Sequence, residues 1–389
     1  MSVNNLSTEQ CYQLIADLHD MATGEASITP TDLSSFISVA QSTLAAGVDP
    51  VLNALSQVVS DTIYAVRPYS RKFKGLEVTS EKWGGILRKV SYADREALAD
   101  QSTLLVDGSS IDQYAVRKPK VLETHYVGED TWSGKYTIFT DQLITAFSNP
   151  AEFGSFMSNL ILHFSNEREQ WLENMSRAAL TNFMGAQNIL GNEHVVHALT
   201  EYNTLTGLAL TSTTVRQPDN FPAFIRWLYS RINTVSDKFT ERSGLYQQSI
   251  TNMPIYRHTP KEDQRVYIAG DFMNEIEAEV KSITYNNSFL NLADVESIGF
   301  WQAIDSPLDI QVTPVYVDSS ALVTVGAAQS MSDVIGVIFD RDAIAYNVKI
   351  NTIETTPYNA EGRYYNMIAH NTITFMNDVT EKGCIFVLD

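Results

Sequence analysis

The chain has 389 residues, 44% of them hydrophobic and 19% charged, with a net charge of −19. This composition predicts an ordered protein with a sizeable core and two or three domains. The charge argues against a surface built to hold nucleic acid, and no apolar run reaches membrane-spanning length. The N-terminal sequence MSVNNLSTEQ also lacks the features of a signal peptide, so we expect the protein to stay in the cytosol where it is made.

Residues 1–66 form a separate acidic segment, with seven Asp or Glu and no Lys or Arg. Three short amphipathic helices fit this segment, the first of them beginning with a capping box made by Ser7 and Gln10. The predicted starts and ends are Ser7 and Gly24, Thr31 and Gly47, and a start at Asp49-Pro50. Each helix is too short to be stable alone, so we expect all three to pack on another part of the chain.

Residues 67–120 are basic, with eleven Lys or Arg and seven Asp or Glu. The net charge of this segment is therefore +4, and that of the rest of the chain is −23. Segments 72–92 and 113–127 mix β-branched and aromatic residues with charges, and the turn Asp107-Gly108-Ser109-Ser110 lies between them. This pattern predicts a long hairpin arm with little apolar surface of its own. Such an arm is suited to lie on the acidic surface of a neighbouring copy, and a solvated surface hairpin is the alternative.

The most prominent element is one helix predicted between Ser148 and Gly191, preceded by a strand and a helical turn over residues 131–147. Pro150 suits the first helical turn, and apolar residues recur at steps of three and four. At 1.5 Å per residue the helix would be roughly 55 Å long. It is too polar at its centre to cross a membrane, so we expect a spine on which sheets pack, with the charges from Glu167 to Glu173 on a face that is exposed or meets a neighbouring copy.

The rest of the chain alternates helices and strands irregularly, which predicts an α+β fold. We expect a helix over residues 219–240 and a buried strand over residues 265–269 that leads into another helix. The last fifty residues are predicted to be β, and two or three antiparallel strands there should cover the spine helix. The expected C-terminal strands are residues 335–339, 343–350, 364–376 and 384–388.

No catalytic or cofactor motif is present: the chain has no Walker loop, dinucleotide fingerprint, nucleophile elbow or zinc-protease helix. His194 and His197 are three residues apart but lack a third metal ligand, so we assign them structural roles. His163 with Glu167 would need a matching motif from a second helix to bind metal. We therefore predict no catalytic residue, no cofactor and no metal site.

Two further features have ordinary structural explanations. Cys11 and Cys384 have neither the spacing of metal ligands nor that of a disulfide framework, so both are expected to be reduced. Asp340-Arg341-Asp342 follows a predicted strand, and we interpret it as a turn that makes ion pairs.

The order of these elements resembles the major capsid proteins of tailed bacteriophages, which have the Hong Kong 97-type fold. The strings that carry the resemblance are TDLSSFISV from Thr31, LSQVV from Leu55, RPYSRKF from Arg67 with Trp83-Gly84, and TIFTDQL from Thr137. The resemblance implies a structural subunit that self-assembles into an icosahedral head around double-stranded DNA. The alternatives are an encapsulin-like nanocompartment shell and, from another class, an enzyme of unrecognised α+β fold.

The resemblance also implies a division of the chain into domains. Residues 1–66 would be an N-terminal helical arm and residues 67–131 an extended loop that overlaps a neighbour. Residues 132–199 and 333–389 would form a peripheral domain with a spine helix over 149–187, and residues 200–332 an axial domain.

The implied partners are other copies of the chain in pentamers and hexamers, a separate scaffolding protein, portal and decoration proteins, and enclosed DNA without sequence-specific binding. A separate scaffold is expected because only about 66 residues precede the arm. The implied location is the virion capsid, assembled in the host cytoplasm. The residues of the arm that we expect to contact a neighbouring subunit are Arg67, Arg71, Lys72, Lys74, Trp83, Arg88 and Lys89.

Overall fold

The structure is a computed structural model of the 389-residue chain. The residues it describes are 7–26, 29–47, 50–51, 54–55, 71–78, 87–94, 106–112, 114, 116, 118–127, 129–251, 253–283 and 295–389. The chain divides into two compact units. Unit 1 comprises residues 1–85, 128–175 and 347–374, and unit 2 comprises residues 86–127, 176–346 and 375–389. The predicted division into arm, loop, peripheral and axial domains stays a prediction.

Unit 1 begins with the helices α1 (Thr8–Thr23) and α2 (Leu33–Ala45). The capping box at Ser7 and the end of α1 at Gly24, which has a left-handed φ of 73°, are as predicted. The predicted cap of α2 at Thr31 is wrong by one residue: Asp32 accepts a hydrogen bond from the N–H of Ser35 at 2.7 Å. Aspartate takes the position because its carboxylate is the better acceptor and stabilises the positive end of the helix dipole. Of the third predicted helix, residues 50–51 and 54–55 are helical and the others lie outside the described residues.

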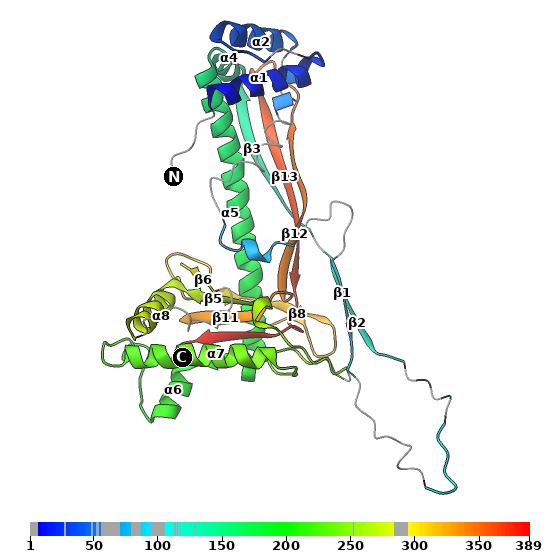
Figure 1. The fold of residues 1–389 in the computed structure, drawn as a ribbon, viewed down its shortest axis with the longest axis vertical. Coiled ribbons are helices and arrows are strands. Elements are labelled where there is room, and N and C mark those ends of the chain that lie inside the picture. The colour runs from blue at the N-terminus through cyan, green and yellow to red at the C-terminus, as the bar shows by residue number, and fades with distance from the viewer. Residues whose placement is uncertain are drawn as a thin grey trace. The chain divides into compact units, whose positions relative to one another are not determined.

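The long predicted helix is confirmed as α5 (Pro150–Leu190), 41 residues long. In unit 1 its first part packs against a three-stranded sheet of order β12-β13-β3, as Figure 1 shows. The elements are β3 (Asp130–Phe139), the short helix α4 (Thr140–Ala146), β12 (Ile344–Thr355) and β13 (Tyr364–Asn377). β13 pairs antiparallel with β3 from Tyr364 opposite Phe139 to Ile373 opposite Asp130.

The core of unit 1 joins both helices of the N-terminal segment to this sheet and to α5. Phe36 of α2 lies 6.0 Å from the ring of Tyr12 in α1 and 6.0 Å from the ring of Phe153 in α5. Residues of the same buried cluster come from β3, β12 and β13: Ile138, Ile353, Tyr365, Met367 and Ala369. The N-terminal helices therefore obtain from α5 the burial that neither could reach alone.

One expectation about α5 is wrong: its central charges are not all on an exposed face. Glu173 is buried, and Glu169 accepts a hydrogen bond from the guanidinium of Arg71 at 2.5 Å. Glu167 is half-buried and lies 3.2 Å from His163, one helical turn away. The error has a physical cause, because a helix covered on several sides can bury a charge wherever another element supplies a partner.

Unit 2 is built on a mixed five-stranded sheet of order β4-β14-β11-β5-β6. β11 pairs antiparallel with β14 and β5, whereas β4 and β6 are parallel to their neighbours. The strands are β4 (Val195–His197), β5 (Gln264–Ala269), β6 (Val295–Ile298), β11 (Val334–Asp340) and β14 (Gly383–Val387). The C-terminal strands are thus confirmed, but they divide between two sheets, because β11 and β14 pair here and not with β12 and β13.

The sheet of unit 2 is buried on both faces. Phe183, from the second part of α5, lies 5.8 Å from the ring of Phe339 on β11, and Gly383 leaves room for the Phe183 ring. The predicted helices are confirmed as α7 (Phe221–Thr240) and α8 (Gly270–Ile283). Ser236 of α7 donates a hydrogen bond to the buried amide of Gln264 on β5 at 2.6 Å.

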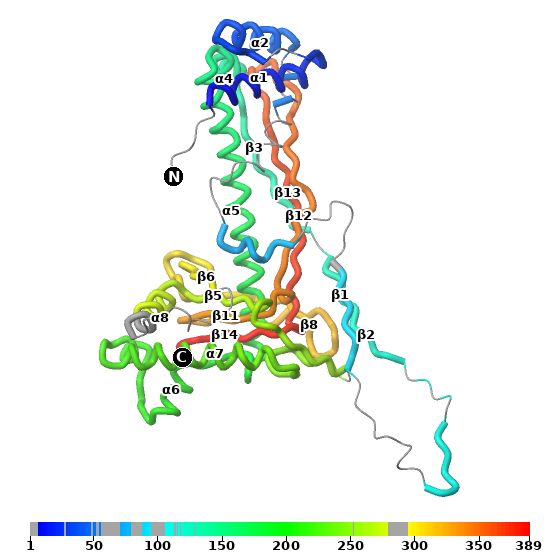
Figure 2. The backbone as a smooth tube through the Cα atoms, in the orientation of Figure 1, coloured from blue at the N-terminus to red at the C-terminus, as the bar shows by residue number. Residues whose placement is uncertain are grey.

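The remaining elements of unit 2 are short, and Figure 2 follows them along the backbone. They are η3 (Asn192–His194), α6 (Ala198–Thr206), η4 (Lys261–Asp263), β7 (Ile310–Val312), β8 (Val315–Val317), β9 (Val323–Val325) and β10 (Gln329–Met331). β7 pairs with β10 and β8 with β9, both antiparallel. Unit 1 also contains the 3₁₀ turn η1 (Lys74–Leu76).

Candidate intersubunit surface

The predicted hairpin arm belongs to unit 2, and its two strands are β1 (Leu87–Tyr92) and β2 (Val121–Tyr126). They pair antiparallel from Leu87 opposite Tyr126 to Tyr92 opposite Val121, side by side in Figures 1 and 2. The predicted turn is present: Ser109 donates its N–H to the carbonyl of Val106 at 2.9 Å, and Gly108 has a φ of 84°. Glycine suits this left-handed position because it has no Cβ.

Side chains alternate between two faces of this ribbon, as the period of two in a strand requires. We call the face that carries Lys89 and Ser91 the inward face, because both side chains contact other parts of unit 2. The outward face carries the exposed side chains Arg88, Val90, Tyr92, Val121, Glu123 and His125. The arm is therefore two-sided, with one face attached to its own subunit and the other open.

The outward face combines charged and apolar groups. Arg88 donates a hydrogen bond to Glu123, and His125 lies 2.9 Å from the same carboxylate. The hydrogen bond from Arg88 holds the pKa of Glu123 below its usual range. Tyr92 is 66% exposed, and Tyr114 beyond the paired strands is 87% exposed. Large apolar surface left in water is typical of a surface that binds a partner.

The inward face is held by a buried charge cluster. The ammonium of Lys89 lies 2.7 Å from Asp378 Oδ2 and 2.6 Å from Glu381 Oε1. Burial alone would lower the pKa of Lys89, but the two carboxylates raise it overall. Burial raises the pKa of Glu381, whereas for Asp378 the attraction of Lys89 outweighs burial and lowers the pKa.

A loop over residues 242–257 attaches the inward face at a second place. Arg257 donates to Ser91 Oγ at 2.7 Å and lies 3.2 Å from Glu381 Oε1. Asp94, two residues beyond β1, donates its N–H to the carbonyl of Pro254 and accepts the N–H of Tyr256, both at 2.7 Å. Arg242 also pairs with Asp94.

The seven residues expected to contact a neighbour fall into different environments. Lys72, Lys74 and Arg88 are exposed, and Lys74 is the first residue of η1. Arg71 is buried in unit 1, between Glu77 and Glu169, and Lys89 is paired within unit 2. Arg67 and Trp83 lie outside the described residues. The sequence did not identify Asp378, Glu381 or Arg257 as partners of the arm, because only the fold brings them to it.

His194 and His197, which are three residues apart, have separate hydrogen-bond partners. His194 is buried with Nδ1 2.5 Å from Gln187 Oε1, and burial lowers the pKa of His194. His197 is exposed, with Nδ1 2.8 Å from Asp389 Oδ1. Among the described residues, no group of three His, Cys, Asp or Glu is placed to hold a metal ion.

The predicted turn at Asp340-Arg341-Asp342 is present, but its main interactions are hydrogen bonds. Asp340 is buried and accepts the Thr259 hydroxyl at 2.5 Å, and burial raises the pKa of Asp340. Arg341 lies 3.9 Å from Asp263, at an exposed position. Cys11 and Cys384 form no disulfide, in line with the expectation that both are reduced, and both side chains are buried. No helix within the described ranges is long and apolar enough to cross a membrane.

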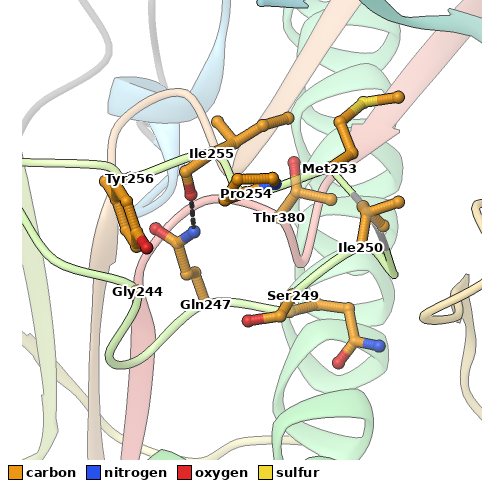
Figure 3. Close-up of a pocket in the computed structure, with 10 residues that line it drawn as sticks. Gly244, Gln247, Ser249, Ile250, Met253, Pro254, Ile255, Tyr256 and Thr380 are labelled. Carbon is orange, nitrogen blue, oxygen red and sulfur yellow. Dashed lines mark hydrogen bonds between the residues drawn. The ribbon is translucent and has the colours of Figure 1, made fainter. Parts of the chain in front are cut away.

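A pocket of about 240 Å³ lies in the loop beside the hairpin arm (Figure 3). Gln247 crosses its wall, donating to the carbonyl of Ile255 and accepting the N–H of Arg257 at 3.0 Å. Ile250, Met253 and Tyr256 add apolar surface. The described residues that line the pocket include no Asp, Glu, His, Lys or Arg.

The fold matches capsid structures. A chain from the capsid structure of Staphylococcus phage Andhra aligns with a TM-score of 0.57 and 11% identity, covering 82% of this chain and 84% of that chain. A chain from the structure of the head fiber and inner core protein gp22 of native bacteriophage P68 gives 0.56 and 12%, covering 82% and 85%. The chain therefore has the α+β fold of tailed-phage capsid proteins, the Hong Kong 97 type.

The family match identifies the class of this protein more narrowly than the fold does. The family model for the Phi29-like phage major capsid protein matches residues 17–387, and the chain belongs to this family. No curated protein sequence matches the chain. The protein is thus a structural subunit of a phage head, located in the virion capsid, which assembles with copies of itself into the shell. Family membership indicates a structural protein rather than an enzyme.

Proposed function

We propose that this subunit builds an icosahedral head of pentamers and hexamers around double-stranded DNA, and that the hairpin arm docks on a neighbouring copy through its outward face. The observation that supports docking is the exposed apolar surface of the arm, because a two-stranded hairpin has no core of its own in which to bury it. On the outward face Tyr92 is 66% exposed, and beyond the paired strands Val106, Tyr114 and Val116 are 74%, 87% and 81% exposed. Contact with a second subunit would remove these side chains from water.

Charge supports the same pairing of arm and neighbour. The segment that contains the arm carries +4 and the rest of the chain −23, so an arm approaching another copy meets the opposite charge. Exposed Lys74 and Arg88 suit such a contact. Arg71 and Lys89 suit it less, because their charges already meet carboxylates of their own subunit. The excess of acidic groups on the rest of the chain would also keep packaged DNA from adhering to the shell.

The partners that complete this proposal are a separate scaffolding protein, a portal and decoration proteins, with assembly in the host cytoplasm. Their support is the family to which the chain belongs. Co-expression with and without a scaffolding protein, followed by sedimentation and electron microscopy, tests the scaffold. Particles that contain DNA after infection support a phage head, and particles filled with cargo protein would point to a nanocompartment.

The docking is tested with the variant Arg88→Glu/Tyr92→Ser/Tyr114→Ser, which changes only exposed positions. We expect a folded subunit with unchanged far-UV circular dichroism and at least a tenfold loss of sedimenting shells. The matched control is Lys261→Glu, which reverses an exposed charge outside the arm, and it should assemble normally. Normal shell yield from the triple variant would overturn docking through the outward face. Arg71 is left unchanged, because a glutamate there would face Glu77 and Glu169 in a buried site.

A further inference from the structure

A buried charge cluster joins the hairpin arm to the body of unit 2, beside the contacts that the arm makes with the loop over residues 242–257. Lys89 on β1 contacts Asp378 and Glu381, which lie in the turn between β13 and β14. The Lys89 side chain is 19% exposed, and those of Asp378 and Glu381 are 2% and 7% exposed. Tyr126, opposite Leu87 on β2, is half-buried on the same side, and burial together with Asp378 raises its pKa. Both strands thus meet the same turn.

The acceptor side of this cluster is held in place by contacts within the body of unit 2. Asp378 Oδ1 accepts the N–H of Thr380 at 2.9 Å and its hydroxyl at 2.7 Å, which leaves Oδ2 for Lys89. The N–H of Asp378 bonds the carbonyl of Ala343 at 2.7 Å. Because the turn holds the Asp378 carboxylate in place, pairing with Lys89 costs little additional side-chain entropy of Asp378.

A second contact fixes the orientation of the arm. Arg257 connects Glu381 to Ser91, and Ser91 lies two residues from Lys89 on the same face of β1. Two attachment points along one strand restrain rotation about either of them. Arg88, which directly precedes Lys89, points to the opposite face and pairs with Glu123 of the arm itself.

The arm depends on these contacts because a two-stranded hairpin has no core and is marginally stable alone. Without the ammonium of Lys89, the Asp378 carboxylate would lose its cation in a site with little access to water, and Glu381 would keep only its contact with Arg257. That cost is relieved if the hairpin lifts and lets water reach them. Loss of Lys89 therefore favours detachment of the arm over unfolding of the sheet beneath it.

We infer that Lys89 is a positioning residue: it clamps the base of the hairpin arm to the Asp378–Glu381 turn of its own subunit and so sets the direction in which the arm extends. The clamp is a property of the single subunit. Its consequence for assembly rests on the proposed docking of the arm. A correctly directed arm presents its outward face to the neighbour, and a detached arm would have to be ordered at the moment of docking, which costs affinity.

Hydrogen exchange of the unassembled subunit tests the clamp with Lys89→Met. We expect the amides of β1 and β2 to exchange at least tenfold faster than in the wild type, with unchanged rates in β11 and β14. Arg88→Met is the matched control, because it removes the adjacent cation from the opposite face, and it should leave the exchange of β1 and β2 unchanged. Lys89→Arg keeps the charge and should retain most of the protection.

A second variant keeps the test decisive if Lys89→Met unfolds the subunit. Lys89→Met/Asp378→Asn removes the ammonium together with the Asp378 carboxylate, while the turn keeps its hydrogen bonds from Thr380 and Glu381 keeps its contact with Arg257. Faster exchange confined to β1 and β2 supports the clamp. Exchange equal to the wild type in both Lys89 variants would overturn it.

Assembly assays separate this inference from the docking proposal. If Arg88→Glu/Tyr92→Ser/Tyr114→Ser assembles normally while the arm of Lys89→Met exchanges faster, the docking proposal is wrong and the inference about Lys89 stands. If that triple variant fails to assemble while the arm of Lys89→Met exchanges as in the wild type, the inference about Lys89 is wrong and the docking proposal stands. With both correct, Lys89→Met should form shells at least fivefold more slowly than Lys89→Arg, which keeps the positive charge that pairs with Asp378 and Glu381.

Discussion

The inward and outward faces of the hairpin arm have neighbouring basic residues in opposite roles. Lys89 is enclosed by Asp378 and Glu381 from a distant turn, whereas Arg88 is exposed and pairs with Glu123 of the arm itself. A buried ion pair is costly to break because it strands a charge, whereas an exposed pair contributes little to stability. The inward face thus attaches the arm to its own subunit, and the outward face is available to a partner. The following substitutions test this difference.

The largest effect on stability is expected for Asp378→Ala on the inward side. The substitution removes the partner of Lys89 and the acceptor of two hydrogen bonds from Thr380. We expect a loss of roughly 3–5 kcal/mol in the free energy of unfolding, measured by urea denaturation. Asp342→Ala, at an exposed position two residues after Asp340, should change it by less than about 0.5 kcal/mol. A loss below about 1 kcal/mol for Asp378→Ala would show that the cluster is not a stabilising contact.

Arg257→Met should have an intermediate effect, because it removes the second attachment of the inward face and leaves Lys89 in place. The lost interactions are the hydrogen bond to Ser91 and the contact with Glu381. We expect a decrease of about 1–2 kcal/mol in the free energy of unfolding. Arg341→Met removes an exposed arginine whose ion pair is 3.9 Å long, and it serves as the control with no measurable change. Equal effects from the two substitutions would contradict a specific role for Arg257.

The pH dependence of the cluster should be set by Asp378. This carboxylate is faced by Lys89 and Tyr126 from the arm and by Glu381 and Thr380 from its own turn. Because the folded-state pKa of Asp378 is lower than its ordinary value of 3.8, its stabilising contribution is complete above that value and is lost as the pH falls through the folded-state pKa. The pKa of Glu381 is shifted upward, so Glu381 takes up a proton first and contributes no such loss.

We therefore expect the stability difference between the wild type and Asp378→Asn to be constant from pH 7 to pH 5 and to shrink below about pH 4. Urea denaturation of both chains over this range measures it. If the difference disappeared between pH 7 and pH 5, Asp378 would be protonated there and would not be the stable partner of Lys89.

The smallest effect on stability is expected on the outward face. Arg88→Met should leave the urea midpoint of the isolated subunit unchanged, because the side chain is solvated and its pair with Glu123 is exposed. The same substitution should slow shell formation measurably if the outward face contacts a neighbour. Destabilisation of the isolated subunit by Arg88→Met would erase the difference between the two faces.

Local sequence signals determined much of this protein. The capping box at Ser7, the turn at Gly108 and the start of α5 at Pro150 follow from interactions within a few residues, and the structure has all three. The hairpin, the helices of unit 2 and the C-terminal strands also follow from local periodicity. The resemblance carried by short strings identified the class of protein, which the family match confirms.

Only the tertiary structure decided which charges are used inside the subunit. Lys89 and Asp378 are 289 positions apart, and Arg71 and Glu169 are 98 apart, so no local pattern could pair them. The sequence likewise did not show that β11 and β14 leave β12 and β13 to join another sheet. The physical reason is the same in each case: the energy of an ion pair or a strand pair depends on distance and burial in space, and these are set by packing between segments remote along the chain.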